Sequence, residues 1–386
     1  MIKQLDDLRL EGKTVLVQSN LDVPLQEGVI TDDTRLRASL PTIQELLKKN
    51  CRVILLGHLG RPEGKPDPSL SLQQIIPKLR ELVKQSITFL PTIDQTLAQH
   101  LPQPSVAVLE NIRMWPGEEQ ESKAFAKQLA QLADAYINDD YIDSHRHTAA
   151  NTQLPKILPS AMGRTLHNEW TKVRKATDNP DRPLTIIIGG AKKDKLDIVE
   201  HVLPSAEHIL IGGVLANTFL AATGVNVQAS KYDEKNIQRA KKLLARSHGK
   251  ILLPTDCVAA SEFSAQAKTV TCYYKDIPEG YQALDLGPST IKAYKKIISQ
   301  SKTIIWGGPI GVFEIPQFAH ASQEIARAVA RSDAYSLIAG GDSAAAINQL
   351  GLAKKVSHVS IGGGATLHLI AGDELPAIAS LSYPAQ

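Results

Sequence analysis

The sequence predicts an α/β protein built from two Rossmann-like domains, with mainly parallel sheets covered by helices and a helix connecting the domains. Short runs of β-branched and aliphatic residues recur along the chain, and longer amphipathic stretches separate them. Continuous apolar strands that alternate with helices are typical of parallel sheets buried on both faces. A chain of 386 residues also exceeds the size of one ordinary hydrophobic core, which favours two domains.

The predicted strands fall into two groups. In the first half of the chain they are Thr14–Val17, Val53–Leu56, Val106–Leu109 and Ala135–Ile137. In the second half they are Leu184–Ile188, His208–Ile211, Ile251–Leu253, Thr303–Trp306, Ser336–Ala339 and His358–Ile361. Helical patterns such as Ala124–Leu132 and Ile325–Ala330 lie between these strands.

A domain boundary is expected near residues 159–183. Leu166, Trp170, Val173 and Thr177 follow helical spacing, and a loop rich in Asp and Pro comes directly after them. The sequence therefore predicts an N-terminal domain over residues 1–160, a connecting helix over 161–178 and a C-terminal domain over 179–386. We expect about the last 20 residues to pack back on the first domain.

Composition excludes several classes of protein. The net charge of +3 and the 5% aromatic content do not fit a nucleic-acid binder. No apolar run approaches the roughly 20 residues that cross a membrane. The N-terminus is charged and lacks a signal-peptide pattern, and three scattered cysteines favour a reducing compartment. We expect a cytoplasmic monomer with small-molecule substrates and neither nucleic-acid nor membrane partners.

Residues that follow the strands differ between the two halves. Basic and polar side chains follow the first-half strands, at residues 18–22, 58–61, 110–113 and 138–146. Glycine clusters follow the second-half strands, at residues 189–190, 212–213, 307–308, 340–341 and 362–364. Arginine side chains suit a small anionic ligand, and glycine turns at helix starts suit nucleotide phosphates. One anion-binding sheet and one nucleotide-binding sheet indicate a transferase.

Two other nucleotide enzymes lack their defining motifs here. A dinucleotide-dependent dehydrogenase needs a glycine-rich turn after the first strand, but residues 18–24 contain no glycine. A P-loop kinase needs a G-x-x-x-x-G-K-[ST] run, which does not occur in the sequence.

Seven ordered motifs resemble those of the phosphoglycerate kinase family. In the first half they are GVITDDTRLRASLPTI (residues 28–43), GHLGRPEGKPDPSLSL (57–72) and LENIRMWPGEE (109–119). In the second half they are IIGGAK (187–192), WGGPIGVFE (306–314), AGGDSAAA (339–346) and SIGGGA (360–365). The resemblance covers essentially the whole chain and implies magnesium-dependent phosphoryl transfer between 1,3-bisphosphoglycerate and ADP, giving 3-phosphoglycerate and ATP.

The resemblance also implies roles for individual residues. Those at the transferred phosphoryl group are Arg35, Lys192 and Gly341. Those for the acid substrate are Asn20, Asp22, Arg35, His58, Arg61, Arg113 and Arg146. Those for the nucleotide are Gly190, Lys192, Lys195, Gly213, Pro309, Glu314, Gly340, Gly341, Asp342 and Ser343, with Asp342 near the nucleotide-bound Mg²⁺. Fixed positive charge suits this reaction, because its transition state is highly anionic.

The chain departs from the family pattern at several positions. Asn20 and Asp22 exchange the usual acid and amide, and Asp143 is expected close to the anion pocket. The lysine motif reads GGAKKDK over residues 189–195, one residue shorter than usual. Ala283 and Val214 replace expected glycines. These departures leave an alternative open, namely a catalytically impaired member of the family that acts as a binding or regulatory protein.

Overall fold

The computed structural model describes residues 2–190 and 195–382, and the chain divides into two compact units. Unit 1 takes the chain up to Trp170 and again from Glu374, whereas unit 2 runs from Thr171 to Asp373. Each unit has a parallel sheet flanked by helices, so the predicted fold class is confirmed.

The sheet of unit 1 is parallel and has the strand order β5-β6-β4-β1-β7-β8. Its strands are β1 (Thr14–Gln18), β4 (Arg52–Leu56), β5 (Ile87–Leu90), β6 (Ser105–Leu109), β7 (Ala135–Asn138) and β8 (Ser160–Met162). A hairpin of β2 (Leu25–Gln26) and β3 (Val29–Ile30) follows β1. Every residue of β1 and β6 is buried, which explains why the central residues of these strands are apolar on both faces of the sheet.

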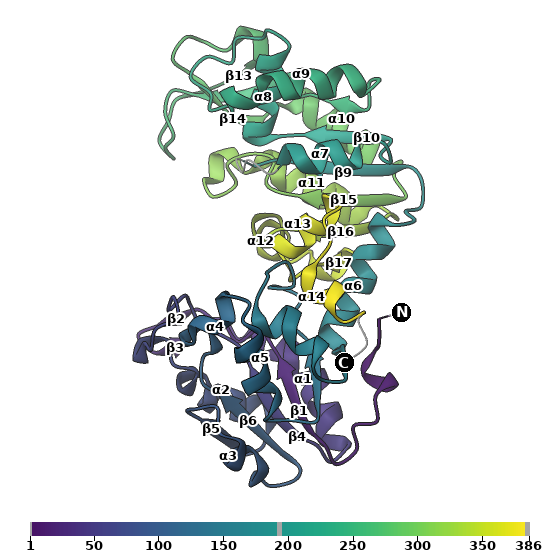
Figure 1. Ribbon diagram of the computed structural model, residues 1–386. Helices are drawn as coiled ribbons and strands as arrows, with labels where there is room; N and C mark the ends of the chain where they lie inside the picture. Colours follow the sequence, from purple (N-terminus) through teal and green to yellow (C-terminus); the bar gives the residue numbers. More distant parts are fainter. Residues whose placement is uncertain (1, 191–194, 383–386) are drawn as a thin grey trace. The chain divides into compact units, whose positions relative to one another are not determined.

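Helices cover the sheet of unit 1 (Figure 1). They are α1 (Thr34–Lys48), α2 (Ile76–Val83), α3 (Gln95–Gln99), α4 (Pro116–Glu119), α5 (Lys123–Ala130) and, near the C-terminus, α14 (Pro376–Ser380). Shorter helical turns are η1 (Leu5–Asp7), η2 (Pro68–Leu70), η3 (Leu72–Ile75), η4 (Ile112–Met114), η5 (Ala149–Gln153) and η6 (Leu154–Lys156). The backbone N–H of Ala377 in α14 donates to the Ser144 carbonyl, which ties the C-terminal segment to unit 1.

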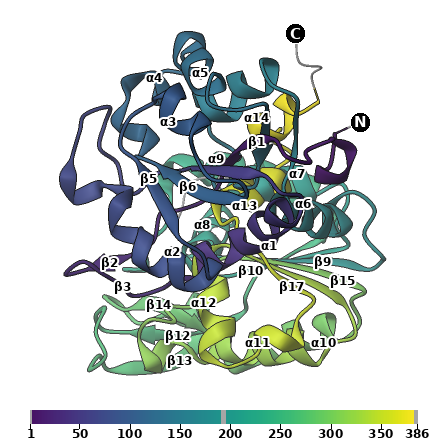
Figure 2. The ribbon, with the colours of Figure 1, turned by 90° about the horizontal axis from the view of Figure 1, so that it is seen from below.

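The main sheet of unit 2 is also parallel, with the order β11-β10-β9-β15-β16-β17. Its strands are β9 (Leu184–Ile188), β10 (His208–Ile211), β11 (Ile251–Leu252), β15 (Thr303–Gly307), β16 (Tyr335–Ala339) and β17 (His358–Val359). A separate antiparallel sheet has the order β13-β12-β14, and these strands lie together in Figure 2. They are β12 (Asp256–Ala260), β13 (Thr269–Tyr273) and β14 (Gln282–Leu286).

The helices of unit 2 flank its parallel sheet. They are α7 (Lys195–Val202), α8 (Gly213–Ala222), α9 (Ile237–Arg246), α10 (Pro288–Ile298), α11 (His320–Arg331), α12 (Gly341–Gln349) and α13 (Gly364–Ile370). Shorter turns are η7 (Glu234–Asn236), η8 (Tyr274–Asp276), η9 (Pro316–Phe318) and η10 (Ala353–Lys355). Within the described ranges, no helix combines the length and the apolar character that crossing a membrane requires.

A long helix, α6 (Arg164–Thr177), lies where the sequence predicts the connecting helix. Asp139 follows β7 and caps the amino end of this helix, because its Oδ1 accepts hydrogen bonds from the backbone N–H groups of Thr165 (2.7 Å) and Leu166 (3.1 Å). The division between the two units falls inside α6, after Trp170.

A buried acid in unit 1 makes stability depend on pH. Burial raises the pKa of Glu118 from 4.5 to about 7, although its Oε2 accepts a hydrogen bond from the Ala150 backbone. Because the folded-state pKa lies above the unfolded one, the stability that Glu118 contributes is complete below pH 4.5 and is lost as the pH rises through 7. Glu118→Gln cannot ionise, so we expect its melting temperature relative to wild type to rise by roughly 3–6 °C between pH 5 and pH 8.

Differential scanning calorimetry at both pH values measures this shift. The control is Glu27→Gln, because Glu27 is exposed in the turn between β2 and β3. A difference between Glu118→Gln and wild type that stays constant with pH contradicts the prediction.

Candidate active site

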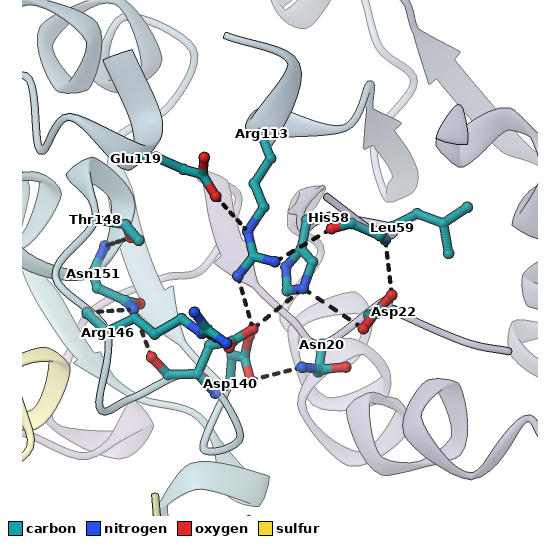
Figure 3. Close-up of polar contacts among 12 residues, drawn as sticks. Asn20, Asp22, His58, Leu59, Arg113, Glu119, Asp140, Arg146, Thr148 and Asn151 are labelled. Atoms are coloured by element: carbon teal, nitrogen blue, oxygen red, sulfur yellow. Dashed lines mark hydrogen bonds and ion pairs between the residues drawn. The ribbon is translucent and has the colours of Figure 1, made fainter. Parts of the chain in front are cut away.

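Charged and polar side chains gather at the carboxyl ends of the parallel strands in unit 1 (Figure 3). They come from the segments that follow neighbouring strands: Asn20 and Asp22 after β1, His58 after β4, Arg113 in η4 after β6, and Asp140, Asp143 and Arg146 after β7. Strand order makes these segments neighbours, since β6, β4, β1 and β7 are adjacent in the sheet. This edge of an α/β sheet is where ligands usually bind.

Gly57 allows the segments after β1 and β4 to approach each other. A Cβ atom at this position would lie 2.7 Å from the carbonyl oxygen of Ser19 and 2.7 Å from Cγ of Leu21. Real Cβ atoms essentially never make such contacts, so a glycine is required here. As a result His58 Nε2 comes within 3.9 Å of Asp22 Oδ2.

Arg35 and Asp22 form a positioned pair. The Arg35 guanidinium donates from Nη1 to the backbone carbonyl of Asp22 and to its Oδ2, the latter at 3.1 Å. The second carboxylate oxygen of Asp22 accepts from the Gly60 backbone N–H at 2.9 Å. Arg35 lies in the first turn of α1, and 40% of its side chain stays exposed, so it can still reach a ligand. Asp22 therefore orients Arg35.

Asn20 is almost fully buried and is held by a residue that the sequence analysis did not single out. Its Nδ2 donates to Asp140 Oδ1 at 3.3 Å (Figure 3). Burial, together with the charge of Asp143, raises the pKa of Asp140 to about 7. The signal for Asp140 was the acidic pair directly after β7, at residues 139–140, where polar side chains are expected to reach the ligand edge.

Asp143 lies among the basic residues, as expected from its position in the sequence. Its carboxylate is 2.5 Å from Arg146 Nε, 3.3 Å from His58 Nε2 and 3.5 Å from Arg113 Nη2. Arg61, also predicted for this site, is exposed in the segment that follows β4.

The protonation states of this cluster follow from burial and charge. Burial lowers the pKa of His58 to about 4, so its imidazole is neutral at physiological pH. Burial alone raises the pKa of Asp143, but His58, Arg113 and Arg146 together bring it below its usual value. At neutral pH the cluster therefore holds an ionised carboxylate facing two arginines.

A cavity of about 620 Å³ opens in unit 2 at the ends of its strands. Five of the residues predicted for nucleotide binding line it, namely Gly190, Gly213, Pro309, Glu314 and Asp342. Apolar residues dominate the rest of the lining, and a mostly apolar cleft with a few polar groups is typical of nucleotide-sized ligands.

Close backbone approach at the cavity requires glycine. A Cβ atom on Gly189 would lie 2.1 Å from the Pro309 carbonyl oxygen, and Gly308 adopts φ of +103°. Because glycine has no Cβ atom, the segments after β9 and β15 can lie against each other here, and Gly190 and Pro309 both line the cavity.

The cavity lining also includes residues that the sequence marked only as departures from the family pattern, or did not mark at all. Val214 and Ala283 line it at positions where glycine was expected, and Asn217, Phe263 and Asp285 were not predicted at all. Asp285 is buried, and burial raises its pKa to about 7, while its Oδ2 accepts from the Ala321 backbone N–H at 3.0 Å. These residues lie on α8 and on or beside the antiparallel sheet, which no motif connects with the nucleotide.

The start of α12 places Asp342 at the cavity. Gly340 adopts φ of +88° and precedes the helix, whose first residue is Gly341. The Ser343 hydroxyl is buried and accepts from the Gly308 backbone N–H at 2.7 Å, so this side chain supports the cavity wall. Asp342 is exposed and lines the cavity, and a single carboxylate beside nucleotide phosphates is the kind of site that Mg²⁺ prefers.

Lys195 is the first residue of α7 and is buried. Its Nζ lies 3.4 Å from the carbonyl oxygen of Gly307, at the carboxyl end of β15. Lys195 therefore lies beside Gly308 and Pro309, next to the cavity, although it is not among the lining residues. Lys192, predicted at the transferred phosphoryl group, lies outside the described residues.

Comparisons with known proteins agree along the chain. Residues 5–373 match the family model described as phosphoglycerate kinase. Phosphoglycerate kinase from Herpetosiphon aurantiacus is 42% identical over 385 residues, covering 97% of this chain and 98% of the relative. Phosphoglycerate kinase from Finegoldia magna is 41% identical, again covering 97% and 98%. The structure of phosphoglycerate kinase from Coxiella burnetii is 32% identical, has a TM-score of 0.93 and covers both chains completely.

Proposed function

The chain belongs to the phosphoglycerate kinase family, and we propose that its two units divide the substrates of that reaction between them. The protein is a phosphotransferase that moves a phosphoryl group reversibly between 1,3-bisphosphoglycerate and ADP, giving 3-phosphoglycerate and ATP, a step of glycolysis. The relatives give no support to the alternative of a binding or regulatory protein.

Unit 1 is proposed to bind the acid substrate. The observation that carries this assignment is the cluster at the strand ends. There Arg113 and Arg146 both contact Asp143, and Arg35 is paired with Asp22. Guanidinium groups match the geometry of carboxylate and phosphate oxygens. His58, neutral at physiological pH, adds a hydrogen-bonding ring without adding charge.

Unit 2 is proposed to bind the nucleotide in its glycine-walled cavity. Gly190, Gly213 and Pro309 let the phosphates approach the backbone, and Glu314 lies at the cavity where a ribose can reach it. Gly340, Gly341 and Ser343 form the start of α12, whose N-terminal backbone N–H groups can donate to phosphate oxygens. Mg²⁺ supplies charge neutralisation at the phosphates when it is bound with the nucleotide, and Asp342 is proposed to hold it there.

Catalysis in this proposal depends on positioning and fixed charge. Arg35 stabilises the negative charge of the transferring phosphoryl group, and Lys192 and Lys195 contribute from the nucleotide side. The described cysteines, at positions 51, 257 and 272, are free thiols, which supports a reducing cytoplasm as the place of action. We also propose that the protein works there as a monomer.

A steady-state assay tests the assignment of the two units. Wild-type protein with 1,3-bisphosphoglycerate and MgADP is expected to form ATP, and the KM for the acid is expected to respond to changes in unit 1 alone. The control is Asp342→Asn, which is expected to raise the KM for MgADP and leave that for the acid unchanged. A protein that binds both ligands in calorimetry but forms no ATP would contradict the proposal.

A further inference from the structure

The acid site carries an internal anion at the centre of its basic cluster. Asp143 Oδ1 accepts from Arg146 Nε at 2.5 Å, and Oδ2 lies 3.3 Å from His58 Nε2 and 3.5 Å from Arg113 Nη2. Only 10% of the Asp143 side chain is exposed. A single carboxylate is thus in contact with three basic side chains that come from three different strand ends.

Arg113, the more buried of the two arginines that contact Asp143, already faces oxygen atoms of the protein with its nitrogen atoms. Arg113 Nε lies 3.8 Å from Glu119 Oε1, Nη1 donates to the Gly60 carbonyl at 3.3 Å, and Nη2 lies 3.5 Å from Asp143 (Figure 3 shows Arg113 and Glu119). An incoming phosphate or carboxylate must share these donors with Asp143. It also meets the negative charge of Asp143 at short range, where little water screens it.

The Asp143 carboxylate also lowers the net positive charge that an incoming anion meets in this cluster. With His58 neutral, Arg113 and Arg146 are the cations that face Asp143, and its carboxylate cancels part of their attraction for an anion. Asp140 contacts the backbone of Asp143, since its Oδ1 accepts a hydrogen bond from the Asp143 N–H at 3.2 Å. Asp143 is therefore held in place from both its backbone and its carboxylate.

We propose that Asp143 is a built-in counter-anion that occupies part of the anion site and sets how tightly the protein holds phosphoglycerate. It is a specificity-determining residue, since an anion gains less from entering this cluster than from entering one without a resident carboxylate. The inference rests on the proposed function of unit 1. Removing the charge while keeping the shape strengthens the binding of anionic ligands.

Isothermal titration calorimetry on three proteins tests this inference. Asp143→Asn is expected to bind 3-phosphoglycerate on the order of tenfold more tightly than wild type, as removal of one nearby charge predicts. The matched control is Asp134→Asn, which makes the same charge change at the opposite end of β7, where Asp134 accepts from the Thr14 backbone N–H. The control is expected to stay within about twofold of wild type. MgADP affinity should be unchanged in all three proteins.

Equal or weaker binding of 3-phosphoglycerate by Asp143→Asn would overturn the proposal and make Asp143 an organiser of the arginines. A thermal melt of Asp143→Ala with inorganic phosphate covers the case in which loss of the carboxylate harms folding. Phosphate should raise the melting temperature of Asp143→Ala more than that of wild type. An equal or smaller rise, or a variant that stays unfolded in phosphate, would also overturn the proposal.

These readouts separate this inference from the function proposed above. A wild-type protein that fails to bind 3-phosphoglycerate contradicts the proposed role of unit 1. In that case the phosphate melts still decide whether Asp143 competes with anions in this cluster.

Discussion

Arg35→Ala is expected to lower kcat by roughly 10³-fold, with changes of less than about tenfold in the dissociation constants of 3-phosphoglycerate and MgADP. In the transition state the negative charge of the phosphoryl group is spread over its three equatorial oxygens, so a cation positioned at these oxygens acts on the rate more than on ground-state binding. The structure gives Arg35 a fixed direction, since Asp22 accepts from its Nη1 through both a carbonyl and a carboxylate oxygen.

The matched control for Arg35 is its neighbour on the same helix. Arg37 lies two residues further along α1, is 56% exposed and pairs with Asp33 at 2.8 Å. Arg37→Ala removes the same charge and is expected to keep kcat within about twofold, because exposed ion pairs contribute little. Arg35→Lys keeps the charge but loses the guanidinium fork, and an intermediate kcat is expected. An Arg35→Ala enzyme within tenfold of wild-type kcat would remove Arg35 from the mechanism.

The parallel sheets could be predicted because their strands are buried on both faces. Thr14–Gln18 and Leu184–Ile188 are mainly apolar and show no alternation, and the structure buries every residue of both. The antiparallel sheet of unit 2 could not be predicted in the same way. Residues of β13 (Thr269–Tyr273) alternate between exposed and half-buried, and no continuous apolar run marks them. The edge strand β8 is three residues long, too short for a periodicity.

The candidate site was predicted where strand ends and motifs coincide. His58, Arg113 and Arg146 were expected together, and the structure brings them around Asp143. Asn20 and Asp22 exchange the acid and amide of the family pattern, and the structure gives Asp22 a further task, the orientation of Arg35. No sequence pattern showed that task, because it depends on Gly57 bringing two loops together and on the Gly60 backbone N–H.

Residues of the nucleotide cavity were predicted less completely. Glycines at strand ends were visible in the sequence, but Asn217 and Phe263 reach the cavity from α8 and from the segment between β12 and β13. Nothing in their own sequence surroundings marks them, because their placement follows from how the antiparallel sheet packs against α8, α10 and α11 within unit 2. Such contacts between distant segments are what tertiary structure adds to a motif.

Lys195→Met is expected to lower kcat/KM for the nucleotide by on the order of 10²-fold, whereas Lys193→Met stays within about threefold of wild type. The lysine motif of this chain is one residue shorter than the family pattern, and removing one residue near a helix start turns the following side chains by about 100°. Either Lys193 or Lys195 must then serve the phosphates, and the sequence favours Lys195 because the family's Asp-Lys pair survives as residues 194–195.

We propose Lys195 for this task, on the position that the structure gives it; Lys193 lies outside the described residues. Lys195 begins α7, is buried, and holds its Nζ 3.4 Å from the Gly307 carbonyl oxygen, beside the Gly308–Pro309 wall of the cavity. A cation at that point strengthens the attraction of a helix start for phosphate oxygens. Methionine is unbranched, one atom shorter than lysine and uncharged, so the variant tests electrostatics with little loss of packing. Melting temperatures of both variants exclude unfolding as the cause of any loss. A larger loss for Lys193→Met than for Lys195→Met would show that Lys193 has taken over the phosphate contact.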